Sequence, residues 1–81
     1  MTQSERTALI NFIRSAYQDV DMYTSMIESY QRDQTTDHST DIKICRVKRS
    51  MIINSLCEMQ YLYEQEGLND LIIDLMDKAN H

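Results

Sequence analysis

The sequence predicts an all-helical (all-α) fold: a long antiparallel helical hairpin followed by a short C-terminal helix. Three observations support this prediction. The 81 residues include one glycine and no proline, apolar residues recur at steps of three and four, and one stretch lacks aliphatic residues. Turn-rich β architectures need glycine and proline, whereas long helices do not. A chain of this length is expected to form one domain, residues 1–81.

The first helix is predicted over about residues 3–32. Its apolar residues alternate steps of four and three, the pattern of a helix that packs along another helix. Thr2 and Glu5 have the spacing of a capping box, in which each side chain accepts the backbone N–H of the other residue. The expected core face comprises Leu9, Ile13, Ala16, Val20, Tyr23, Ile27 and Tyr30.

A polar loop is predicted over residues 33–41, because many side chains there compete for helical hydrogen bonds. Ser39 or Thr40 is expected to cap the second helix, which is predicted over about residues 42–66. Gly67 is suited to a left-handed cap and is expected to end that helix. The expected core face of the second helix comprises Ile42, Cys45, Ile52, Leu56, Met59 and Tyr63.

A last helix is predicted over about residues 69–79, with acidic residues at steps of four and three along one face. That face is either solvated, or part of an acidic amphipathic helix that docks in the groove of a partner. The apolar residues expected on its other face are Leu68, Leu71, Ile72, Leu75 and Met76.

The apolar faces of the two long helices look wider than one neighbour can cover. A helix that contacts one partner has an apolar arc of about 100°, whereas these arcs approach about 200° on a helical wheel. We therefore expect a homodimer that forms a helical bundle. The residues expected to need shelter are Ile10, Tyr17, Ile44, Val47 and Leu62.

Several function classes have no support in the sequence. No nucleophile–base pair and no glycine-rich phosphate loop is visible, so we expect neither an enzyme nor a cofactor. His38 and His81 have no second soft ligand at zinc spacing, so no metal is expected. Cys45 and Cys57 are twelve residues apart on one predicted helix, too distant for a disulfide. Reduced thiols and the lack of a long apolar run indicate a cytoplasmic protein without a membrane partner.

A basic run at residues 43–49 holds four of the eight positive side chains in a chain of net charge −5. It could neutralise Glu28, Asp33 and Asp37 across the hairpin, bind an acidic protein, or bind nucleic acid. Nucleic acid is the weakest option, because a pI near 4.7 repels phosphates. The members of the run are Lys43, Arg46, Lys48 and Arg49.

Arg49 falls on the apolar stripe of the second helix, where it needs an ion pair within the assembly or a partner contact. Met22 and Met51 lie further from the core stripes and could be core or binding residues. The predicted partner-binding residues are Lys43, Arg46, Arg49, Met51, Leu71 and Leu75.

Part of residues 48–77 resembles the small bacterial connector proteins that act on two-component and biofilm regulators. The matching residues are Lys48-Arg49-Ser50, Leu56-Cys57, Leu68-Asn69, Leu71-Ile72 and Leu75. The resemblance covers less than half of the chain and excludes the first helix and the polar loop. It implies a role in binding a regulatory protein.

We therefore expect a small regulatory or adaptor protein of prokaryotic or phage origin. It would bind and modulate a larger protein, such as a transcription regulator, a signalling kinase or a secretion component. The alternative is a structural dimerisation module or assembly chaperone. A nucleic-acid binder is a third possibility, and a steep loss of affinity with salt would distinguish it.

Overall fold

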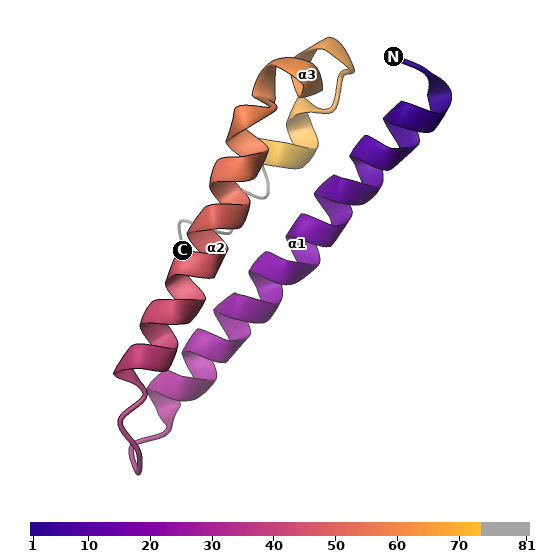
Figure 1. The fold of residues 1–81 in the computed structure, drawn as a ribbon. Coiled ribbons are helices and arrows are strands. Elements are labelled where there is room, and N and C mark those ends of the chain that lie inside the picture. The colour runs from indigo at the N-terminus through magenta and orange to yellow at the C-terminus, as the bar shows by residue number, and fades with distance from the viewer. Residues whose placement is uncertain (74–81) are drawn as a thin grey trace.

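A computed structural model describes residues 1–73 of the chain and confirms the predicted all-helical hairpin (Figure 1). Its helices are α1 (Gln3–Arg32), α2 (Ser39–Glu58) and α3 (Gln60–Gln65), and residues 69–73 are helical as well. In Figure 1, α1 and α2 run antiparallel, and the segment after α3 folds back beside the hairpin. None of the helices in this part of the chain combines the length and apolar character needed to span a membrane.

The start of α1 is fixed by the predicted capping box. The Glu5 backbone N–H donates to Thr2 Oγ1 at 3.1 Å, and the Thr2 N–H donates to Glu5 Oε1 at 2.9 Å. These two bonds satisfy donors that a helix N-terminus otherwise leaves unpaired. The hydrogen bond from the Thr2 backbone N–H, followed by that from the Thr2 side chain, lowers the pKa of the Glu5 carboxylate.

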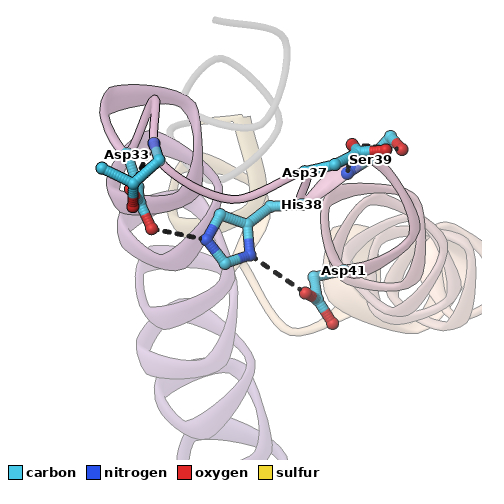
Figure 2. Close-up of polar contacts among 6 residues, drawn as sticks. Asp33, Asp37, His38, Ser39 and Asp41 are labelled. Carbon is cyan, nitrogen blue, oxygen red and sulfur yellow. Dashed lines mark hydrogen bonds and ion pairs between the residues drawn. The ribbon is translucent and has the colours of Figure 1, made fainter.

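The loop between α1 and α2 is shorter than predicted, because α2 begins at Ser39. The predicted cap by Ser39 or Thr40 is wrong. Instead Asp37 accepts both the backbone N–H and the hydroxyl of Ser39, at 3.0 and 2.7 Å, and Figure 2 shows this carboxylate beside Ser39. An aspartate before a helix can satisfy its first donors as well as a hydroxyl residue can.

The predicted single helix over 42–66 is also wrong, because a turn at Met59 separates α2 from α3. Met59 has φ −103° and ψ 15°, outside the helical region. Neither glycine nor proline marks this position, so the break has no local sequence signal.

Gly67 follows α3, the last part of the predicted second helix, and adopts the predicted left-handed conformation with a φ of 69°. The Leu68 N–H donates to the Tyr63 carbonyl at 2.9 Å, and the Gly67 N–H donates to the Glu64 carbonyl at 3.3 Å. This pair of bonds is a Schellman motif, which reverses the chain after a helix. Arg6 holds the turn to α1, since its guanidinium donates to the Glu66 carbonyl at 3.1 Å.

The core lies along the α1–α2 contact and under the turn after α3. Most of the predicted face of α1 is buried, whereas Tyr23 and Tyr30 are half-buried. Ile10, Tyr17 and Leu62 were expected to need a second subunit, but they are half-buried and pack against this core. The buried residues of the main cluster are Leu9, Ile13, Ala16, Val20, Leu56, Tyr63, Leu68 and Ile72.

Candidate functional site

Among the described residues, an exposed apolar surface forms a groove on the half of α2 nearest the loop. We call it the α2 groove; it is lined by Thr40, Lys43, Ile44, Val47, Lys48 and Met51. Ile44, Val47 and Met51 are 47%, 54% and 62% exposed. Their spacing of three and four residues places them on one side of the helix. Cys45 and Leu56, which are buried, mark the side of α2 that faces α1.

Two ammonium groups flank this apolar strip. On a helical wheel, Lys43 and Lys48 fall on opposite sides of Val47, about 40° and 100° away from it. The Lys48 ammonium lies 5.9 Å from the centre of the Tyr23 ring, a cation–π contact with α1. Among residues 1–73, no acidic residue lines the α2 groove, and neither lysine forms an ion pair with another of these residues.

Of the predicted partner-binding residues that lie within residues 1–73, Lys43 and Met51 line the α2 groove together. The guanidinium of Arg49 points to α1, where it donates to Thr24 Oγ1 at 3.1 Å. Arg46 is exposed but does not line the groove. Leu71, 42% exposed, lies in the helical segment 69–73 near the other end of α2 (Figure 1).

Leu75 lies outside the described residues, as do the predicted apolar Met76 and the acidic positions 74 and 77. The sequence analysis placed Ile44 and Val47 among the residues that need a second subunit. Thr40 and Lys48 were not among the predicted partner-binding residues. The missed signal was the overlap in sequence between the apolar strip, residues 44–51, and the basic run, residues 43–49.

The predicted neutralisation of the basic run by Glu28, Asp33 and Asp37 is not found among the ion pairs of residues 1–73. Asp37 bonds Ser39 instead. Asp33 accepts a hydrogen bond from Thr35 Oγ1 at 2.6 Å, and its other carboxylate oxygen is hydrogen-bonded to His38. Asp33 and Asp37 are therefore held by the loop itself and, within residues 1–73, form no ion pair with the lysines beside the groove.

His38 joins the two helix ends as a bridge between carboxylates (Figure 2). Its Nε2 lies 2.7 Å from Asp33 Oδ2, and its Nδ1 lies 3.2 Å from Asp41 Oδ2. The imidazole also packs against Tyr30, with ring centroids 4.7 Å apart. Hydrogen bonds to Asp33 and then to Asp41 raise the pKa of His38. Bonds from Thr35 and from His38 lower the pKa of Asp33 to about 2.

This arrangement stabilises the protonated imidazole but offers little catalytic chemistry. Both ring nitrogens face carboxylates, so neither faces a hydroxyl or thiol from which it could take a proton. Within residues 1–73, no group of histidine, cysteine and acidic side chains could hold a metal ion. Cys45 and Cys57 are free thiols, the first of them buried.

A second, smaller hollow lies where α1 meets α2. Its lining includes the half-exposed Phe12 and the acidic Asp19, together with Ser15, Ala16, Ile52 and Ser55. It has one large exposed apolar side chain, compared with three in the α2 groove. The α2 groove is therefore the stronger candidate for a binding surface.

Comparison of the chain with protein-family models, curated proteins and solved structures gives no match. The geometry of the α2 groove is therefore the basis of the proposed function.

Proposed function

We propose that the chain is a non-enzymatic regulatory or adaptor protein that binds a larger protein through the α2 groove. The partner would be of the class expected from the sequence: a transcription regulator, a signalling kinase or a secretion component. The two free thiols, Cys45 and Cys57, fit a cytoplasmic site of action.

The observation that carries this proposal is the exposure of Ile44, Val47 and Met51 on one face of α2. An isolated exposed apolar residue needs no explanation, but a contiguous strip with a polar rim is typical of a protein-binding surface. The hairpin already has a core on the other side of α2, so this strip is not needed to hold α1 and α2 together.

Affinity capture from the native host tests the proposal. The bait would be the tagged chain, compared with Val47→Asp in the groove and Met22→Asp on α1. Met22 is a matched control because it is 47% exposed on another helix. We expect Val47→Asp to lose the captured partner and Met22→Asp to retain it. Ile44→Gln provides a milder second variant, and circular dichroism would check that each variant stays helical.

A homodimer is the second candidate, and one observation favours it. Lys43 and Glu58 are exposed near opposite ends of α2 and are about 60° apart around the helix. A second copy that runs antiparallel could therefore pair each lysine with the glutamate of the other copy. Sedimentation of the wild type and Val47→Asp tests it: a dimer that Val47→Asp dissociates would support self-association through the groove.

A further inference from the structure

We infer that the α2 groove receives an acidic amphipathic helix of another protein. This inference rests on the proposed function and names the kind of partner. Three features must match: the length of the apolar strip, the spacing of its side chains and the charge on its two sides.

The strip from Ile44 to Met51 is about 10 Å long, which is two turns of helix. An amphipathic helix presents apolar side chains at steps of three and four over the same length. Two helices packed along their apolar strips bury the exposed parts of Ile44, Val47 and Met51. A peptide that binds as an added β-strand would need an unpaired strand edge, which the helical groove does not provide.

Charge selects among helical partners. Lys43 and Lys48 lie on opposite sides of the strip, so carboxylates on both sides of a docked apolar stripe would each meet an ammonium group. Lys48 is already positioned by its contact with Tyr23, which lowers the entropy lost on binding. A docked helix with acidic flanks thus finds both of its charge partners.

A second copy of the chain matches less well. Its Glu58 can pair with Lys43, but Asp41, the carboxylate on the Lys48 side of α2, is already bonded to His38. An anionic membrane also matches less well, because the net charge of −5 opposes approach to it. An acidic helix can place one carboxylate beside each of the two lysines that flank the strip.

Designed peptides test the inference. Three fluorescein-labelled helical peptides would share one leucine stripe and carry glutamate, glutamine or lysine on both sides of it. Fluorescence anisotropy would measure Kd for the full chain. The glutamate peptide should bind roughly ten-fold tighter than the glutamine peptide, since two partly exposed ion pairs contribute about that much. The lysine peptide should bind weakest.

Variants locate the charge effect. In the double variant Lys43→Gln/Lys48→Gln, the preference for the glutamate peptide over the glutamine peptide should fall below about two-fold. Arg46→Gln is the matched control, because Arg46 is exposed on α2 but does not line the groove. It should keep the full preference. Val47→Asp should weaken binding of all three peptides.

Other results would overturn the inference. Equal affinity for the glutamate and glutamine peptides would refute an acidic partner, although the groove would still be a helix-binding site. Absence of any peptide binding would remove the helical partner, while host capture with Val47→Asp would still decide the proposed function separately. A dimer that Val47→Asp dissociates, or binding to phosphatidylserine vesicles that Val47→Asp abolishes, would assign the groove to that occupant instead.

Discussion

Replacement of Gly67 tests whether the left-handed turn after α3 directs the rest of the chain. The residue has φ 69°, and its turn places Leu68 and Ile72 in the main core cluster. A Cβ added at Gly67 would have no atom within 4 Å. Any loss of stability must therefore come from backbone conformation and not from a clash.

The magnitude follows from two opposing effects. A non-glycine residue in the left-handed region costs about 1–2 kcal/mol. Alanine also restricts the unfolded chain, which stabilises the protein by about 0.4–1 kcal/mol. Gly67→Ala should thus lower the free energy of unfolding by about 1 kcal/mol. Gly67→Asn should cost less, because asparagine enters this region more readily, and Gly67→Val should cost more, because it is β-branched.

Thermal unfolding followed by circular dichroism measures this series. A loss of about 1 kcal/mol lowers Tm by about 4–8 °C for a domain of this size. Gln65→Ala, an exposed position in α3, is the control and should leave Tm nearly unchanged. Equal stability of glycine, alanine and valine at position 67 would refute the reasoning, since it would mean that no left-handed residue is required there.

Three further predictions concern polar groups. The hydroxyl of Tyr63 is buried without a partner among residues 1–73, so Tyr63→Phe should raise the free energy of unfolding by about 1 kcal/mol in urea titration; a loss would show that the hydroxyl is bonded. The raised pKa of His38 stabilises the fold fully below its unfolded value of 6.5, and this contribution disappears as pH rises through the folded value. Its partner Asp33, with a pKa of about 2 instead of 3.8, contributes above 3.8 and loses its contribution as pH falls toward 2. The Tm difference between wild type and His38→Gln should accordingly be largest near about pH 5 and shrink by about pH 9; a difference that grows with pH would contradict this. Arg49→Ala should cost about 1 kcal/mol of folding stability through the lost bond to Thr24, with little effect on partner affinity; a double-mutant cycle with Thr24→Ala that shows no coupling would refute it.

The hairpin could be predicted because its determinants are local or periodic. The capping box at Thr2 and Glu5 and the apolar heptads fix α1, and Gly67 marks the last turn. The break at Met59 could not be predicted, since its side chain is compatible with helix on both sides. The bonds that Asp37 accepts from Ser39 were missed because aspartate, serine and threonine all bond the first donors of helices, and position alone does not rank them.

Prediction of the site was less complete, because which apolar side chains stay exposed depends on how the helices pack. Ile44, Val47 and Met51 could be seen in the sequence as apolar residues outside the core face of the second helix. Ile10 and Tyr17 stand in the same way outside the core face of the first helix. Only the packed structure shows that the latter two lie against the core while the former strip stays exposed. Likewise, the direction of the Arg49 side chain toward Thr24 depends on the register of α1 against α2.

Photo-crosslinking from position 47 is the most direct test of the central claim that the α2 groove is the protein-binding surface. Val47→p-benzoylphenylalanine would place a photo-crosslinking group in the groove, and Met22→p-benzoylphenylalanine would place it on a comparably exposed site of α1. After irradiation in the native host, we predict one crosslinked partner from position 47 and none from position 22. Crosslinking of that partner from position 22 and not from position 47 would contradict the claim.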